Sequence, residues 1–80
     1  MKRWDILEDM VICSHVIDGD INNKKVVKAL CKEFNITASQ LSARANNFKH
    51  IVNGKTSFWH TSRQEREAFR LLIKHNTLVL

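Results

Sequence analysis

The sequence predicts an all-α domain: a three-helix core of the helix-turn-helix type, followed by a fourth helix. Apolar residues recur every three or four positions in four segments of the chain, as in amphipathic helices. Three of these segments begin with a capping box, and the 80 residues contain no proline that would interrupt a helix. At this length, residues 1–80 are expected to form one domain with a single modest core.

The first helix is expected from about residue 6 to residue 17. Asp5 is its expected N-cap, and Glu8 three residues later completes a capping box. The turn Asp18-Gly19-Asp20 should end this helix. Its inward stripe is expected to comprise Ile6, Met10, Cys13 and Ile17.

The next two helices are expected to meet at a tight corner. The second helix should run from Asn23 or Lys24 to Phe34, and Asn35 suits the left-handed residue that follows a helix. Thr37 then caps the third helix, and Gln40 completes its capping box. In a helix-turn-helix, such a corner directs the second of its two helices into the major groove of DNA. This third helix is expected over residues 38–51, with Leu41, Ala45, Phe48 and Val52 inward and Gly54 as its left-handed stop.

The fourth helix is expected to begin after Thr61 or Ser62 and to end at about residue 75. Phe69, Leu72 and Ile73 should face inward, whereas Leu71 lies on the far side. Ile12 and Val16 likewise lie on the far side of the first helix. Either these two helices pack against each other, or their surplus apolar surface forms a homodimer.

Charge is distributed unevenly along this basic chain, which has a net charge of +5. Residues 1–20 hold two basic and five acidic side chains, for −3, whereas residues 21–80 hold eleven basic and three acidic ones, for +8. This distribution suits a domain that contacts a polyanion with its later helices. It is also compatible with an ordinary basic protein that has no polyanionic partner.

The outer face of the third helix has the composition expected of a surface that reads DNA. The segment 38–52 contains no Asp or Glu, although solvated helix faces commonly mix both charges. Amides, hydroxyls and methyl groups are suited to base edges in the major groove. Helical geometry places Ser39, Ala43, Asn46 and His50 on the outer face, with Gln40, Ser42 and Asn47 on its flanks. The residues expected to contact phosphates are Thr37, Lys24, Lys25, Lys28, Lys49 and Lys55.

Three larger side chains are interpreted one by one. Arg44 lies at the boundary of the buried and outer faces, where it could reach a guanine, a phosphate or an acid within the fold. Trp4 is expected to pack against the core. Trp59 is expected to pin its loop onto the fourth helix, with base stacking as the alternative.

The sequence indicates neither an enzyme nor a cofactor or metal protein, and no small-molecule substrate is expected. Cys13 and Cys31 are expected to be buried thiols in a reducing cytoplasm, because two cysteines do not make a disulfide framework. The cysteines and histidines lack the paired spacing of zinc ligands. No apolar run is long enough to span a membrane, and acidic residues interrupt the start of the chain where a signal peptide would be apolar.

Two short segments carry a family resemblance. Residues 2–9, Lys-Arg-Trp-Asp-Ile-Leu-Glu-Asp, resemble the start of Myb/SANT-like helical domains, in which a Trp precedes a helix with paired acids. The longer arrangement over residues 3–72, including Asn47-Phe48-Lys49, resembles helical modules at the N-termini of bacterial and phage HNH-type endonucleases. Myb-like domains keep regularly spaced tryptophans, and this chain has none between Trp4 and Trp59. The resemblance implies a DNA-binding module whose third helix reads the site.

Two functions of different classes follow. The first is a sequence-specific double-stranded DNA-binding protein, a small bacterial or phage transcriptional regulator that acts as a homodimer on a two-fold site. The second is a helical protein-interaction module, such as a phage-encoded inhibitor or adaptor, that does not bind DNA. In that case Ile12, Val16, the acidic first helix and residues 77–80 would form the working surface.

Overall fold

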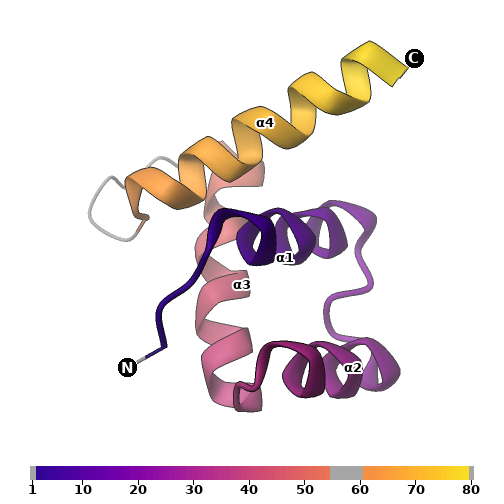
Figure 1. Ribbon diagram of the computed structural model, residues 1–80. Coiled ribbons are helices and arrows are strands. Elements are labelled where there is room, and N and C mark those ends of the chain that lie inside the picture. The colour runs from indigo at the N-terminus through magenta and orange to yellow at the C-terminus, as the bar shows by residue number, and fades with distance from the viewer. Residues whose placement is uncertain (1, 55–60, 80) are drawn as a thin grey trace.

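The protein folds as an assembly of α-helices. The computed structural model describes residues 2–54 and 61–79, with the backbone alone from residue 76 onward. This part of the chain forms α1 (Ile6–Asp18), α2 (Lys24–Phe34), α3 (Ala38–Val52) and α4 (Arg63–Val79), as Figure 1 shows. The all-α prediction is confirmed, and the helix bounds agree closely except that α4 continues about one turn beyond residue 75. No glycine or proline lies in that turn to stop the helix.

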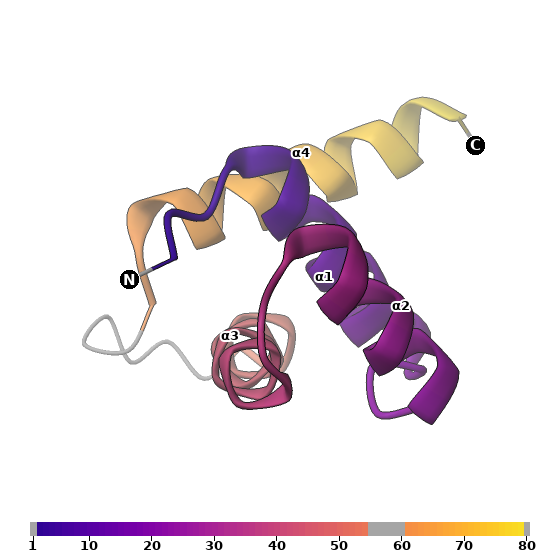
Figure 2. The same ribbon diagram turned by 60° about the horizontal axis from the view of Figure 1, so that its bottom comes forward.

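The helices are arranged so that α3 is supported from one side. Figure 1 shows α4 crossing α1 and the C-terminal end of α3, and α1 packs against both of these helices. Figure 2, which views α3 end-on, shows α1 and α2 on one side of it. None of the described helices lies on the opposite side. The fold therefore leaves one long face of α3 open.

Side-chain caps fix the starts of the helices. In the capping box at the start of α1, the Asp5 side chain accepts a hydrogen bond from the Glu8 amide at 2.8 Å, and the Glu8 side chain accepts one from the Asp5 amide at 3.0 Å. Ser62 and Glu65 form the same reciprocal pair at the start of α4, at 3.1 and 2.7 Å. The third box, at the start of α3, is described with the site below. Each box satisfies amide groups that the first turn of a helix leaves unpaired.

The corner between α2 and α3 has the predicted backbone. Asn35 adopts the left-handed conformation at φ 54° and ψ 53°, which ends α2 and redirects the chain. The amide of Ile36 donates to the carbonyl of Cys31 at 3.0 Å, and the Ile36 side chain is buried in the corner. The orientation of α3 against α2 is thus set by the three corner residues 35–37, which lie between the two helices.

The core differs from the sequence prediction on α1. Ile12 is fully buried beside Cys13, and Val16 packs partly against the same core, whereas Ile17 is 39% exposed. The sequence prediction placed Ile17 on the inward stripe and Ile12 on the far side of the helix, where it would either pack against the fourth helix or form a homodimer. The reason is α4, which packs against α1 and widens its buried surface. Of the two alternatives for this apolar surface, intramolecular packing is therefore correct for Ile12.

Two further core predictions are wrong at helix ends. Val52 is 36% exposed, and Ile51, one helical turn after the buried Phe48, packs against the core in its place. Ile73 is 44% exposed because the C-terminal part of α4 extends beyond the other helices, as Figure 1 shows. The inward residues Leu41, Ala45 and Phe48 of α3 are buried as predicted.

Candidate nucleic-acid interface

The open face of α3 consists of short side chains. Ser39, Ala43, Asn46 and His50 are all exposed, and helical geometry puts them on one side of the helix. The buried residues Leu41, Ala45 and Phe48 lie on the other side of the helix, so this side points away from the core. No acid lies anywhere in α3, so no negative charge on the helix itself opposes a polyanion. We refer to these four residues as the reading face.

The first turn of α3 is held by its capping box. Thr37 Oγ1 accepts a hydrogen bond from the Gln40 amide at 3.1 Å, and Gln40 Oε1 accepts one from the Thr37 amide at 2.9 Å. Both side chains are exposed. Because the cap occupies the Gln40 carbonyl oxygen, the side-chain NH₂ group of Gln40 is the part that can still donate to a ligand.

The two flanks of α3 face different parts of the molecule. Ser42 and Lys49 line a small pocket against Asn22, in the connection between α1 and α2. Asn47 lies on the opposite flank, towards residues 2–5, which we call the N-terminal arm. Ser42 is exposed, and Asn47 and Lys49 are half-buried. The sequence-predicted flank residues are thus divided between two sides of the reading face.

Arg44 is engaged inside the fold, which is the third of the three roles left open for it. Its Nε and Nη2 atoms each donate to a carboxylate oxygen of Asp9, both at 2.8 Å. Asp9 is fully buried, and only 15% of the Arg44 side chain is exposed. A two-bond guanidinium–carboxylate pair has a fixed geometry and a strong charge-assisted character. This pair therefore ties α3 to α1 at the boundary between the buried face of α3 and the flank that carries Gln40 and Asn47.

Two further polar side chains extend this pair to α4. Gln64 Nε2 donates to Asp9 at 2.8 Å and also to the carbonyl of Trp4 at 2.7 Å. Glu65 is 1% exposed, and one of its oxygens lies 3.6 Å from Arg44 Nε without a hydrogen-bond partner among the described residues. One guanidinium thus faces two buried carboxylates. A buried charge is tolerated only when it is paired, so the position of Arg44 is strongly constrained.

The N-terminal arm is a part of the site that sequence reasoning missed. Lys2 Nζ donates to Glu8 at 2.8 Å and to the carbonyl of Phe34 at 3.1 Å, which fastens the arm to α1 and to the end of α2. Trp4 packs against the core as expected, with the Arg44 guanidinium 5.2 Å from its ring centroid. Such a cation–π contact adds to the fixing of Arg44. The basic start of the chain was the available signal, but nothing local indicated that it would lie beside α3.

The lysines predicted to contact phosphates are not gathered in one place. Lys24 and Lys28 are exposed on α2. Lys25 lines a separate groove with His15 of α1, and no α3 residue lines that groove. Lys55 and Trp59 lie outside the described residues. Of these lysines, Lys49 is the one on α3 itself.

The described residues contain no group of three or more His, Cys, Asp or Glu side chains arranged to hold a metal ion. Cys13 is buried, and this burial, together with the charge of Asp9, raises the pKa of its thiol to about 11. The thiol is therefore protonated at neutral pH, and a protonated buried thiol is a poor nucleophile and metal ligand.

None of the helices in the described part of the chain has both the length and the apolar character needed to cross a bilayer.

Comparison with protein-family models, with curated proteins and with solved structures found no match to this chain.

Proposed function

We propose that the protein binds double-stranded DNA by placing the reading face of α3 in the major groove. One observation carries this proposal: the exposed face of α3, which no described helix covers, is free of acids and presents short side chains suited to base edges. An α-helix fits the major groove, and Ser, Asn and His can bond base edges while the Ala43 methyl can contact thymine.

Rigid support of α3 agrees with this role. The bonds from Arg44 to Asp9, and from Asp9 to Gln64, fasten α3 to α1 and α4 at the boundary of its buried face. A reading helix must keep its register on DNA. A fixed orientation of α3 would direct the same side chains to the same base pairs each time the protein binds. Lys49, and Lys28 on α2, would add sequence-independent contacts to phosphates.

The proposal extends to a small bacterial or phage transcriptional regulator in the cytoplasm, in line with the resemblance to endonuclease-associated helical modules. One reading helix contacts few base pairs, so a homodimer on a two-fold site would supply the affinity and specificity that a regulator needs.

A fluorescent pool of random duplexes, titrated with the protein at two salt concentrations, tests the proposal. Binding should weaken steeply as salt rises, because phosphate contacts release counterions. Sequencing of the retained duplexes should then reveal a preferred site. A folded sample that fails to bind at low salt would refute the DNA-binding function.

The alternative is a protein-interaction module that does not bind DNA. Part of the surface that the sequence suggested for such a module is inaccessible to a partner, because Ile12 is fully buried and Val16 is half-buried. A different observation favours this alternative: Leu7 is 69% exposed and Val11, one turn later on α1, is 38% exposed. A tight protein partner that is lost in Leu7→Ser, with no DNA binding at low salt, would select this function.

A further inference from the structure

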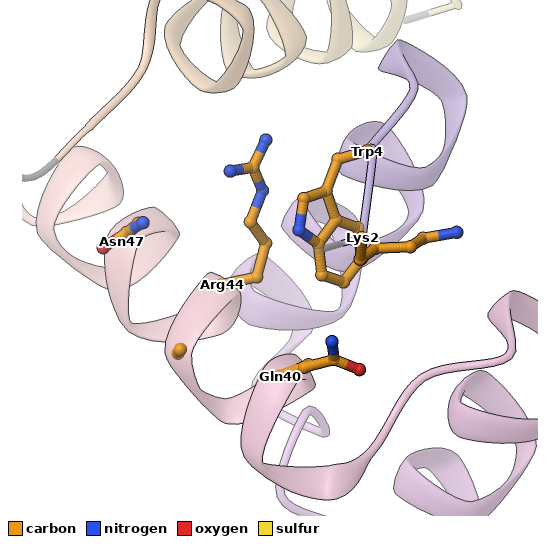
Figure 3. Close-up of a pocket in the computed structure, with 6 residues that line it drawn as sticks. Lys2, Trp4, Gln40, Arg44 and Asn47 are labelled. Carbon is orange, nitrogen blue, oxygen red and sulfur yellow. The ribbon is translucent and has the colours of Figure 1, made fainter.

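An open pocket lies between the N-terminal arm and the flank of α3. Its volume is about 370 Å³, and six residues line it: Lys2, Trp4, Gln40, Ala43, Arg44 and Asn47. Figure 3 shows Gln40, Arg44 and Asn47 along α3, with Lys2 and Trp4 of the arm across from them. No carboxylate side chain lines this pocket.

The amides that line the pocket present donors. The Gln40 carbonyl oxygen is occupied by the Thr37 amide, so its NH₂ group is left to donate, and Figure 3 shows this nitrogen directed towards Trp4. The side chain of Asn47 has no partner among the described residues, and its nitrogen lies on the side of Arg44 in Figure 3. Two carboxamide NH₂ groups are therefore available on one flank of α3.

The aromatic and cationic residues add two more donor groups. Lys2 Nζ and Arg44 Cζ lie 5.7 and 5.2 Å from the centroid of the Trp4 ring, so both cations make cation–π contacts with it. Figure 3 shows the ring nitrogen on the edge that faces α3, and this N–H has no partner among the described residues. Arg44 uses Nε and Nη2 for Asp9, which leaves its Nη1 group without a partner in the described part of the chain.

The balance of donors and acceptors indicates the class of ligand. Amide, indole and guanidinium N–H groups surround the pocket, and the Asn47 carbonyl is the one side-chain acceptor among its six lining residues that no capping bond occupies. Of the acids nearby, Glu8 is paired with Lys2, and the buried Asp9 and Glu65 share the single guanidinium of Arg44. The positive end of the α3 dipole lies close to Gln40. Unpaired N–H donors, in a pocket with no carboxylate among its lining residues, favour an oxyanion over a cation or a neutral base.

We propose that this pocket binds a phosphate group. If the phosphate belongs to DNA, the inference rests on the proposed function. Gln40 and Asn47 would then contact the phosphate backbone of the DNA and not a base. The dimensions agree with this assignment. An α-helix about 10–12 Å across fills a major groove about 12 Å wide, so its flanks face the phosphate strands that border the groove. A free phosphate compound would use the same donors.

Indole resonances give a direct test, because the chain has two tryptophans. A ¹⁵N–¹H spectrum of the full chain should show two indole N–H signals, and Trp4→Phe should remove the signal of Trp4. Potassium phosphate is titrated in, with potassium chloride at matched ionic strength as the reference. We expect saturable shifts of the Trp4 indole and of the Gln40 and Asn47 side-chain NH₂ signals with phosphate alone.

Variants keep the test specific. Asn47→Ala removes a pocket donor without touching Trp4 and should weaken phosphate binding by about tenfold, the typical effect of one hydrogen bond to a charged group. The matched variant Asn53→Ala alters an exposed amide at the end of α3, outside the pocket, and should not change the titration. Equal affinity in Asn47→Ala and wild type would count against the pocket.

A second titration with a short duplex distinguishes the sources of the phosphate. If the same three signals shift with duplex, the DNA backbone supplies the phosphate. If they respond to inorganic phosphate and no duplex binds, the pocket takes a free phosphate compound, and the DNA-binding function fails while the pocket stands. If duplex binds while these signals stay fixed, and inorganic phosphate also leaves them unchanged, the phosphate pocket is refuted and the DNA-binding function stands.

Discussion

The side chain of Arg44 on α3 donates two hydrogen bonds of 2.8 Å to the buried carboxylate of Asp9 on α1, 35 residues earlier in the chain. It also lies 3.6 Å from the second buried carboxylate, that of Glu65 on α4. Three helices thus meet at one guanidinium. The open face of α3 can be rigid because this pair fixes the helix at the boundary of its buried face.

Replacing Arg44 by Met should destabilise the domain strongly, because it leaves two buried carboxylates without a cation. Loss of one partner of a buried pair lowers the free energy of unfolding by about 3–5 kcal/mol. Urea denaturation followed by circular dichroism measures the change. Arg70→Met is the matched control, since Arg70 pairs with Glu67 on the exposed side of α4, and it should change stability little. Equal losses in the two variants would show that the buried pair has no special role.

Asn35 should tolerate glycine but not alanine. Its left-handed backbone costs an ordinary L-residue about 1–2 kcal/mol, and glycine adopts it freely. Asn35→Ala is therefore expected to lower the free energy of unfolding by about 1 kcal/mol, and Asn35→Gly to change it by less than about 0.5 kcal/mol. The midpoints of urea denaturation of Asn35→Ala and Asn35→Gly, each compared with that of wild type, test this prediction. A midpoint for Asn35→Ala equal to that of wild type would mean that the corner adopts another conformation.

The buried thiol of Cys13 should make stability depend on pH in the alkaline range. The pKa of this thiol rises from an ordinary value of 9.0 to about 11 in the folded protein. Between these values the unfolded chain loses the proton and the folded chain keeps it. The folded state binds more protons, so the free energy of unfolding should fall as pH rises through this window.

Cys13→Ala should reduce that slope between pH 9 and pH 11, whereas Cys31→Ala should keep it. Urea denaturation of both variants and of wild type at several pH values gives the three slopes. Because all other ionisable groups are common to wild type and Cys13→Ala, the difference between their slopes isolates Cys13. Parallel curves for wild type and Cys13→Ala would contradict the assignment.

On DNA, the reading face and the lysines should have separable effects. Asn46→Ala should reduce the discrimination between a selected duplex and random duplexes by about 1–3 kcal/mol, because a bidentate base contact is lost. Lys49→Gln should weaken binding to all duplexes alike and reduce the slope of log affinity against log salt by about 0.9. Titrations of both variants at several salt concentrations separate the two contributions. Loss of discrimination in Lys49→Gln instead would reverse the assignments.

Local structure was predictable because its determinants lie close together in sequence. The capping boxes Asp5–Glu8 and Thr37–Gln40 and the left-handed Asn35 each depend on residues within one turn, and all three occur as predicted. Hydrophobic spacing likewise predicted the buried face of α3 through Phe48. These features do not depend on how the helices are arranged.

The buried charges were not predictable in the same way. Asp9 lies in an acidic stretch and resembles a surface residue until Arg44, far along the chain, is placed against it. The position of Ile12 depended on which side of α1 would contact α4, and apolar residues on both sides of α1 left that choice open. The proximity of Trp4 to Gln40 and Asn47 is also a tertiary contact that no local pattern indicates.

The most direct test of the central claim compares one substitution at two exposed alanines. Ala43 lies in the reading face of α3, and Ala29 is exposed on α2. Glutamate at position 43 would place a carboxylate against base edges and phosphates, whereas glutamate at position 29 adds the same charge on α2, outside the reading face. We expect Ala43→Glu to weaken binding to a random duplex pool at low salt at least about tenfold more than Ala29→Glu, a difference of about 1.4 kcal/mol. Equal affinities of the two folded variants would contradict the claim that α3 binds DNA.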